Sequence, residues 1–429
     1  MTEREKQIIG LVHREVKPAL GCTEPIAVAL AVAKAVEILI ESEPFDRMTH
    51  ELQIKAAVSG NILKNGMGVG VPGTGMLGLH IAAALGAVCG KSEYGLEVLH
   101  DLSETSIARA KEILPSVSIT LADTELKLYV EAEVIANGRS ATAIIENVHD
   151  HIVKTLLDGH ILSQDSKEGV NDEDEEDYGI SVREIIDFAN TVDIKDIDFI
   201  LADREMNGRL AEEGMNGNYG LCVGQTIMKD NEGNFGKSFL TYAMAMTAAA
   251  SDARMAGCTL PAMSNSGSGN QGITVSMPVI AYAKHYGVSD EKLARALILA
   301  NLIAIHIKSG LGKLSALCGC VVASTGAASG ITWLKGGDYG QICATIKNMI
   351  GNITGMVCDG AKVGCAMKVA SGVYTAIQSS MMAIDSHCVS EHDGIIDKDI
   401  EKTIANLGKV GSIGMKSTDD IILDIMVCK

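Results

Sequence analysis

The hydrophobic pattern of this chain changes twice along its length, and that change limits the folds it can adopt. Between residues 45 and 160, apolar and polar residues alternate in short runs, as at Ile54, Ala56 and Val58. Alternation with a period of two is typical of strands with one buried face. From Ser181 to the end, apolar residues follow helical spacing between glycine-rich turns. The pattern predicts an α+β protein with a large helical region.

The strands and helices of the alternating region can be assigned from local signals. Asn137-Gly138 separates two apolar runs and predicts a tight hairpin turn. The expected strands are residues 51–58, 116–121, 126–136 and 140–148, and the expected helices are residues 76–88 and 103–113. Hairpin-linked strands predict a mainly antiparallel sheet.

Changes in composition suggest four segments. Residues 1–44 are expected to form N-terminal helices that pack on the helical region, and residues 45–160 form the α+β lobe. An acidic linker is expected over residues 161–180, because residues 172–177 are all acidic and like charges repel one another. Residues 181–429 make up the helical region.

Charge and hydropathy exclude several classes of partner. The net charge is −18 and no basic block is present, which argues against nucleic-acid binding. The longest strongly apolar stretch, residues 296–307, is too short to cross a bilayer, and the N-terminus lacks the apolar core of a signal peptide. We therefore expect a cytoplasmic protein with no membrane partner. A homo-oligomer is compatible with the sequence, which does not fix the oligomeric state.

The spacing of the C-terminal cysteines suggests a metal centre. An odd total of eleven cysteines in a reducing compartment argues against a disulfide framework. Cys318 and Cys320 form a C-x-C pair, while Cys358 and Cys365 lie seven residues apart with two glycines between them. Thiolates from separate segments can hold an iron–sulfur cluster, and this spacing fits no common zinc pattern. Buried structural thiols are the alternative interpretation.

Cys22 lies at the turn before a long apolar helix. The positive end of a helix dipole lowers the pKa of a nearby thiol, and a thiolate can serve as base, nucleophile or ligand. A buried turn cysteine is the alternative.

A loop rich in small polar residues follows Pro261. Its hydroxyl and amide groups can hold the carboxylate and amino group of a zwitterion, which makes it a candidate binding loop for a small amino-acid substrate. The candidate residues in it are Asn265, Ser266, Ser268 and Asn270. Lys308 is a further candidate, either as a carboxylate partner or as a Schiff-base lysine for pyridoxal phosphate. His306, on an apolar helix, is interpreted as a hydrogen-bonded core histidine.

Gly68, Gly70 and Gly73 match the G-x-G-x-x-G pattern of dinucleotide-binding loops. Such a loop must follow a strand directly, whereas residues 61–65 intervene here and Pro72 interrupts the loop. We interpret these glycines as a tight turn that packs against another element. An anion nest is a further alternative.

Four motifs together resemble the L-cysteine desulfidase family. They are GCTEP at 21–25, SNSGSGNQG at 264–272, LSALCGC at 314–320 and MVCDGAKVGC at 356–365. They occur in this order over essentially the whole chain. That family is similar to the α chain of iron–sulfur L-serine dehydratases. Their C-D-P-V…P-C segment resembles Cys358–Cys365, although the two cysteines lie closer together in this chain.

The resemblance implies a mostly helical catalytic domain with an inserted α+β lobe and a [4Fe–4S] cluster with one open iron. The implied ligands are Cys318, Cys358 and Cys365, with Cys320 as the rival of Cys318, and Cys22 is the implied catalytic base. The implied reaction is β-elimination from L-cysteine to give pyruvate, ammonia and sulfide. The alternatives are an L-serine dehydratase, dependent on iron–sulfur or pyridoxal phosphate, and a non-catalytic iron–sulfur sensor.

Cys428 is the penultimate residue. If it lies on a flexible tail, its thiol can reach an open iron and inhibit the enzyme. A disordered tail without a function is the alternative.

Overall fold

The computed structural model describes residues 1–429 except 20, 166–178, 231–232, 312–314 and 429. The chain forms two compact units. The helical unit comprises residues 1–21, 177–359 and 363–429, and the α+β unit comprises residues 22–176 and 360–362. The expected fold class, α+β and mostly helical with a mainly antiparallel sheet, is confirmed.

The α+β unit is built on a six-stranded sheet with the order β3-β2-β4-β5-β6-β7. The strands are β2 (Gln53–Val58), β3 (Val117–Leu121), β4 (Tyr129–Ala136), β5 (Arg139–Glu146), β6 (Ile152–Leu157) and β7 (His160–Gln164). β2 pairs with β3 in parallel, and the other described ladders of this sheet are antiparallel. Ile54, Ala56 and Val58 are buried, as their alternation predicts.

The predicted hairpin joins β4 to β5. Asn137 and Gly138 both have positive φ, 54° and 77°, so both occupy the left-handed region. A two-residue turn with this geometry matches the twist of the strands on either side, and Asn-Gly is the sequence that adopts it with least strain.

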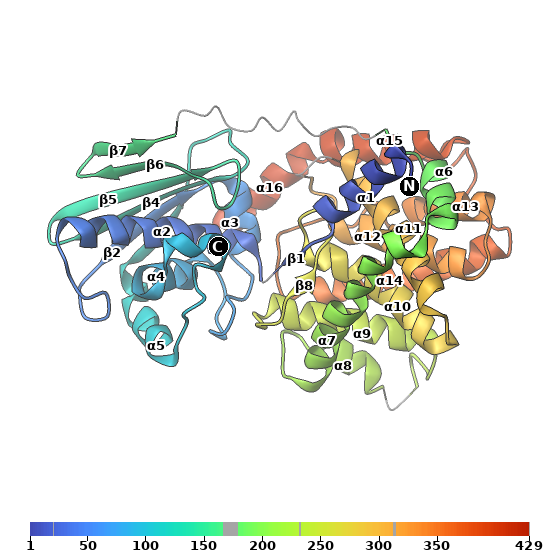
Figure 1. Cartoon of the computed structure of the whole chain (residues 1–429), viewed down its shortest axis with the longest axis horizontal. Coiled ribbons are helices and arrows are strands. Elements are labelled where there is room, and N and C mark those ends of the chain that lie inside the picture. The colour runs from blue at the N-terminus through green and yellow to red at the C-terminus, as the bar shows by residue number, and fades with distance from the viewer. Residues whose placement is uncertain (20, 166–178, 231–232, 312–314, 429) are drawn as a thin grey trace. The chain divides into compact units, whose positions relative to one another are not determined.

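Four α-helices lie in the described part of the α+β unit. They are α2 (Thr23–Ser42), α3 (Gly60–Gly66), α4 (Leu79–Cys89) and α5 (Glu104–Ile113). α2 runs along the sheet, where it contacts β4 and β5, and α4 packs against it (Figure 1). A Cβ added at Gly86 in α4 would overlap the carbonyl oxygen of Ala29 in α2. Small residues thus let the two backbones approach closely, which is how a core with few aromatic side chains is filled.

Two expected segment boundaries differ from the structure. Residues 1–44 are divided between the two units: residues 1–21 belong to the helical unit, whereas α2 packs on the sheet of the α+β unit. The lobe also extends past residue 160, because β7 pairs with β6 through residues 160–164. The acidic run at residues 172–177, expected as a linker, lies outside the described residues.

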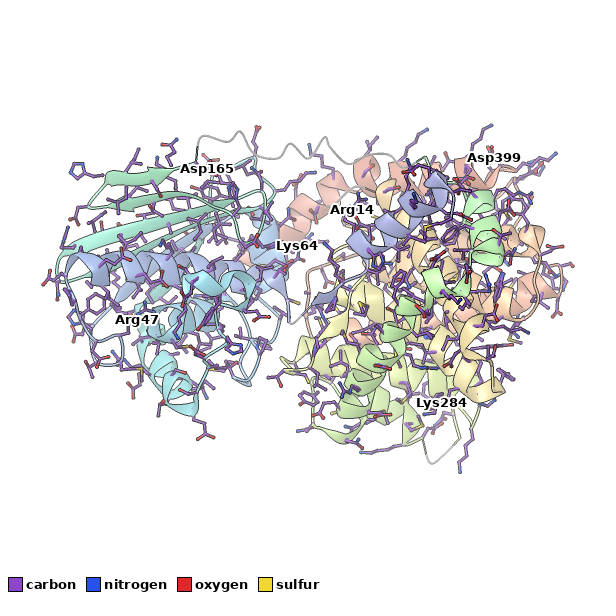
Figure 2. All side chains as sticks on the ribbon, in the orientation of Figure 1. Arg14, Arg47, Lys64, Asp165, Lys284 and Asp399 are labelled. Carbon is purple, nitrogen blue, oxygen red and sulfur yellow. The ribbon has the colours of Figure 1, made fainter. Side chains whose placement is uncertain are left out.

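The glycine-rich loop of the α+β unit packs against a short return of the chain. Gly68 forms a parallel bridge with Lys362, and Gly70 pairs with Leu77. Gly360, at φ 90°, approaches the backbone of Lys64, which Figure 2 labels. Gly68 therefore packs against another element, as interpreted from its sequence.

The helical unit is a bundle around α12. Its helices are α1 (Glu3–Glu15), α6 (Val182–Thr191), α7 (Ala202–Asn216), α8 (Val223–Met228), α9 (Phe239–Met255), α10 (Gly269–Tyr286), α11 (Asp290–Ser309), α12 (Gly319–Leu334), α13 (Tyr339–Ile353), α14 (Cys365–Ile384), α15 (Ile400–Lys409) and α16 (Lys416–Val427). α12 contacts α10, α11, α13 and α14 and is buried from Cys320 to Thr332. Gly326 lets α12 approach the backbone of α11 at Ala300.

A small ladder fixes the N-terminal segment inside the helical unit. β1 (Pro18–Ala19) pairs antiparallel with β8 (Ala262–Met263). The N–H of Ser264 donates to the carbonyl of Lys17 at 2.8 Å, and the N–H of Ser266 donates to the carbonyl of Glu15 at 2.9 Å. The start of the polar loop is thus held by the first residues of the chain.

Among the described residues, no helix combines the length and the apolar character needed to cross a membrane.

The close approach of α2 and α4 can be tested by substitution. Gly86→Ala should lower the free energy of unfolding by about 1–3 kcal/mol, because the added Cβ overlaps the Ala29 backbone. Gly10→Ala is the matched control, since Gly10 is exposed in α1 with nothing within 4 Å of an added Cβ. It should be neutral or stabilise by up to about 1 kcal/mol. Equal effects of the two variants in urea denaturation would contradict this packing.

Candidate functional site

Two segments that carry cysteines form a short antiparallel ladder in the helical unit. Leu317 bridges Val357. The N–H of Cys318 donates to the carbonyl of Met356 at 2.9 Å, and the N–H of Cys358 donates to the carbonyl of Ala316 at 2.6 Å. Because side chains alternate along a strand, Cys318 and Cys358 project from the same face of this ladder.

Helices begin at two of the three candidate ligand cysteines. Cys318 is the N-cap of α12, and Cys365 is the first residue of α14. The unpaired N–H groups and the positive dipole end of a helix both favour negative charge at such positions. The two helix starts therefore suit thiolates or an anionic group held by them.

The Cys318 thiol lies close enough to Cys358 and Cys365 for their charges to affect its pKa. Burial raises the pKa of the Cys318 thiol to about 12, and the negative charges of Cys358 and Cys365 act in the same direction. A half-buried thiol in this position is costly to ionise without a compensating positive group.

Cys320 occupies a different environment from its neighbour in the C-x-C pair. Its thiol is buried and donates to the carbonyl of Lys368 in α14 at 3.2 Å. A Cβ added at Gly372 would lie 2.6 Å from its Sγ. Cys320 therefore packs into the contact between α12 and α14.

Lys368 supplies a cation beside the thiols, and the sequence interpretation missed it. Its Nζ donates to the carbonyl of Val357 at 2.7 Å and to Asp359 Oδ1 at 2.5 Å. Burial acts to lower the pKa of Lys368, but the hydrogen bond to Asp359 and the charges of Cys318 and Cys358 outweigh it, so the pKa is raised. The sequence feature that points to Lys368 as a site residue is its position one helical turn after Cys365.

The donor set, cysteine thiols beside two helix starts and a lysine, has the residue types that could hold an iron–sulfur cluster. Three cysteine thiols come from two segments, beside two helix starts and one lysine. Among the described residues, no group of three or more His, Cys, Asp or Glu side chains is arranged to hold one metal ion. A cluster is bound through thiolates on different iron atoms, so its ligands need not converge on a single point.

Asn265 holds the polar loop in place, because its side-chain amide makes four hydrogen bonds within the helical unit. Its Nδ2 donates to the side chain and the carbonyl of Asn301, at 2.9 and 3.3 Å. Its Oδ1 accepts from Gln271 Nε2 at 2.8 Å and from Ser266 Oγ at 2.9 Å. These four bonds point to a positioning role within the loop.

The hydrogen bonds continue to a buried carboxyl group that sequence reasoning did not find. Asn301 Nδ2 donates to Asp203 Oδ2 at 3.1 Å, and Asp203 Oδ1 has no hydrogen-bond partner among the described residues. Burial raises the pKa of Asp203 to about 7. We call Asp203, Asn301, Asn265 and Gln271 the buried amide network.

Gln271 connects this network to the cysteines. A Cβ added at Gly319 would lie 3.1 Å from Gln271 Oε1. Gly319 directly follows Cys318, so the first turns of α10 and α12 lie against each other. Two motifs that are separate in the sequence, the polar loop and the C-x-C pair, are thus brought together within one unit.

The remaining loop residues lie around the start of α10. Ser268 is its N-cap and accepts from the N–H of Gln271 at 3.3 Å. Ser266 has a positive φ of 48°. Asn270 Oδ1 is buried and has no donor among the described residues. Substrate binding by these side chains stays a prediction.

Lys308 and His306 lie near the end of α11. His306 Nε2 forms a 2.7 Å hydrogen bond with Glu401, which also accepts from the N–H of Val182 at 2.7 Å. His306 is therefore a hydrogen-bonded histidine, as interpreted from the sequence. Lys308 lies in the last turn of α11, and its carbonyl accepts from the N–H of Leu311 at 3.0 Å.

Cys22 belongs to the α+β unit. It is buried and is the N-cap of α2, as expected for the thiol before the long apolar helix. The next residue, Thr23, forms a 3.3 Å hydrogen bond with His149. Burial lowers the pKa of His149, which favours a neutral imidazole near the start of α2. Sequence reasoning did not single out His149, because it lies far from Cys22 along the chain.

Cys428 does not lie on a flexible tail, so that premise is wrong. Residues 416–427 form α16, and the N–H of Cys428 donates to the carbonyl of Asp424 at 3.1 Å. Cys428 is thus the C-cap of α16, and its side chain is exposed.

Comparison with known proteins identifies one matching family and several relatives that align over nearly the whole chain. Residues 93–424 match the family described as the serine dehydratase alpha chain. A UPF0597 protein of Phocaeicola vulgatus is 49% identical over 432 residues, covering 100% of this chain and 98% of its own. A UPF0597 protein of Bacteroides fragilis is 48% identical with complete coverage of both chains. One from Oleidesulfovibrio alaskensis is 47% identical, with 98% and 97% covered.

The raised pKa of Asp203 predicts a pH-dependent stability. The folded protein keeps this proton up to about pH 7, whereas the unfolded chain releases it near pH ~3.9. Stability must therefore fall as pH rises between these values. Asp203→Asn should remove a fall on the order of 4 kcal/mol, at about 1.4 kcal/mol per pKa unit.

Urea denaturation between pH ~4.5 and ~8 measures this effect. Part of the slope should remain in the variant, because burial also raises the pKa of Asp252, to about 6. Asp187→Asn, at an exposed position of α6, is the control and should leave the slope unchanged. Parallel pH curves for the wild type and Asp203→Asn would refute the assignment.

Proposed function

Because this chain belongs to the serine dehydratase alpha chain family, we propose that it is an iron–sulfur-dependent lyase that converts L-cysteine into pyruvate, ammonia and sulfide. Family membership supports a β-elimination lyase. The observation that carries the iron–sulfur assignment is the ladder that places Cys318 and Cys358 on one face, with Cys365 close enough to affect the Cys318 thiol. The preference for cysteine rests on the four sequence motifs.

In this proposal, Cys318, Cys358 and Cys365 hold a [4Fe–4S] cluster. With three protein ligands, a bound cluster supplies a Lewis-acidic iron that has an open position. The starts of α12 and α14 and the ammonium group of Lys368 stabilise the negative charge of the thiolates. Cys320 is not a ligand in this scheme, since its thiol is engaged with the backbone of Lys368.

The proton chemistry is assigned to Cys22. As a thiolate, Cys22 Sγ takes the α-proton of the substrate, and the electron pair left on Cα forms the Cα–Cβ double bond as sulfide leaves from Cβ. The aminoacrylate produced tautomerises to an imine, which water hydrolyses to pyruvate and ammonia. The position of Cys22 as the N-cap of α2 supports the thiolate form.

Substrate binding is assigned to the polar loop and to Lys308. The hydroxyl groups of Ser266 and Ser268 and the amide of Asn270 are the proposed contacts to the zwitterion. Asn265 acts by holding the loop, because its amide is already fully hydrogen-bonded.

Dehydration of L-serine is the second candidate, and the description of the matching family favours it. Serine and cysteine differ only in the leaving group on Cβ, so the same base and the same zwitterion contacts serve both. The two candidates are separated by comparing the two substrates on one preparation.

The first test uses protein purified without oxygen. The wild type should contain iron and acid-labile sulfide and should form pyruvate faster from L-cysteine than from L-serine. Cys358→Ala should lose the cluster and the activity. Cys22→Ala should keep the iron, while kcat falls by about 10²–10⁴-fold, since only the base is removed. Cys343→Ala, half-buried in α13, is the control and should retain both.

The outcomes separate the alternatives. Faster turnover of L-serine would assign the protein as a serine dehydratase. A protein without iron that still makes pyruvate would exclude the cluster and favour pyridoxal phosphate on Lys308. An intact cluster without turnover of either amino acid would contradict the lyase assignment.

The two thiols of the C-x-C pair should respond differently to substitution. Cys318→Ala should lose iron, because a ligand is removed. Cys320→Ala should keep iron and lose only about 1 kcal/mol of stability through the small cavity left against α14. Iron content per chain, together with thermal unfolding, measures both effects. Loss of iron in Cys320→Ala with retention in Cys318→Ala would reverse the ligand assignment.

A further inference from the structure

Arg254 is a buried cation whose bonding is incomplete. Arg254 lies in the last turn of α9 and is 7% exposed. Nη2 donates to the carbonyl of Gly21 at 2.7 Å, but Nε has no hydrogen-bond partner among the described residues. No carboxylate in the described part of the chain forms an ion pair with it. A buried guanidinium in this state is costly, because its charge and one of its donors are uncompensated.

The guanidinium lies against the start of α10. A Cβ added at Gly269 would lie 2.6 Å from Cζ and 2.9 Å from Nη2 of Arg254, and closer still to Nε. Only glycine at this position leaves room for the guanidinium. The N–H groups of Gly269 and Asn270 precede the first intrahelical bond of α10, which runs from Gly272 to the carbonyl of Ser268.

Two positive features therefore meet at one place. The N-terminus of an 18-residue helix carries a partial positive charge, and Arg254 adds a full one. Neither stabilises the other, so the fold maintains an electrostatic cost here. An anion with two oxygen atoms removes this cost, since the guanidinium fork and the helix N–H groups both donate to it.

We propose that Arg254 and the start of α10 bind the α-carboxylate of the amino-acid substrate. This inference rests on the proposed function and names the binding determinant of the same site. Asn270 Oδ1, the buried acceptor without a donor in the same helical turn, suits the substrate's ammonium group. The unpaired donor Arg254 Nε thus suits the carboxylate of the zwitterion, and the unpaired acceptor Asn270 Oδ1 suits its ammonium group. Gln271, one residue further on, packs against Gly319 beside Cys318.

Binding can be measured separately from turnover with an unreactive ligand. L-Alanine has the zwitterion of the substrate but no leaving group on Cβ, and L-alaninamide replaces its carboxylate by a neutral amide. Calorimetric titration of the anaerobically prepared wild type should show L-alanine binding about 10–100-fold more tightly than L-alaninamide. Equal affinity for the two ligands would overturn the proposal without any substitution.

Substitutions locate the determinant. Arg254→Gln should weaken L-alanine binding by about 10–100-fold and leave L-alaninamide unchanged. Arg254→Lys should lie between, since it keeps the charge but loses the planar fork. Arg295→Lys is the control, because the half-buried Arg295 already bonds to Glu291 and to the carbonyls of Ala189 and Val192. It should change thermal stability without changing the affinity for L-alanine.

The outcomes distinguish this inference from the proposed reaction. Arg254-dependent binding of L-alanine in a protein that makes no pyruvate from cysteine or serine would support the carboxylate site and contradict the lyase. An active lyase whose KM and L-alanine affinity are unchanged in Arg254→Gln and Arg254→Lys would support the proposed reaction and contradict the carboxylate site. If Arg254→Gln does not fold, the lysine variant and the wild-type comparison of the two ligands decide the question.

Discussion

The short ladder between residues 316–318 and 356–358 is the constraint on which the candidate metal centre depends. Two hydrogen bonds and one bridge set the register that puts Cys318 and Cys358 on the same face. A shift of one residue would turn one thiol to the opposite face. The same register leaves Cys320 to enter α12 and pack against α14, so the ladder separates one thiol of the C-x-C pair from the other.

Around this ladder, the helical unit brings together helix starts and two cations, of which Lys368 pairs with Asp359 and Arg254 has no ion-pair partner among the described residues. α12 and α14 begin at cysteines, α10 begins at the polar loop, and Lys368 and Arg254 are both buried or half-buried. The buried amide network fixes the loop that leads into α10. A fold that keeps helix starts and cations together in low dielectric is suited to bind anionic groups, whether thiolates or a carboxylate.

Local signals were sufficient for much of the fold. The period-two alternation predicts β2, and Asn137-Gly138 predicts the hairpin, because both depend on neighbouring residues alone. α2 was recognised as a buried helix but assigned to the wrong neighbours. Which surface an all-apolar helix covers is a matter of tertiary packing, and its sequence carries no directional information.

By itself, the sequence determined the fold class, the position of Cys22 at a helix start and the separate cysteine and polar motifs, since each is written in a few consecutive residues. Only the tertiary structure decided how these motifs meet. Gln271 reaches Gly319, Asn301 reaches Asn265, and Arg254 reaches Gly269 across different helices. Asp203, Asn301, Lys368 and Arg254 look like ordinary helical residues in the sequence. Their roles follow from burial and from partners that only the packed helices bring within reach.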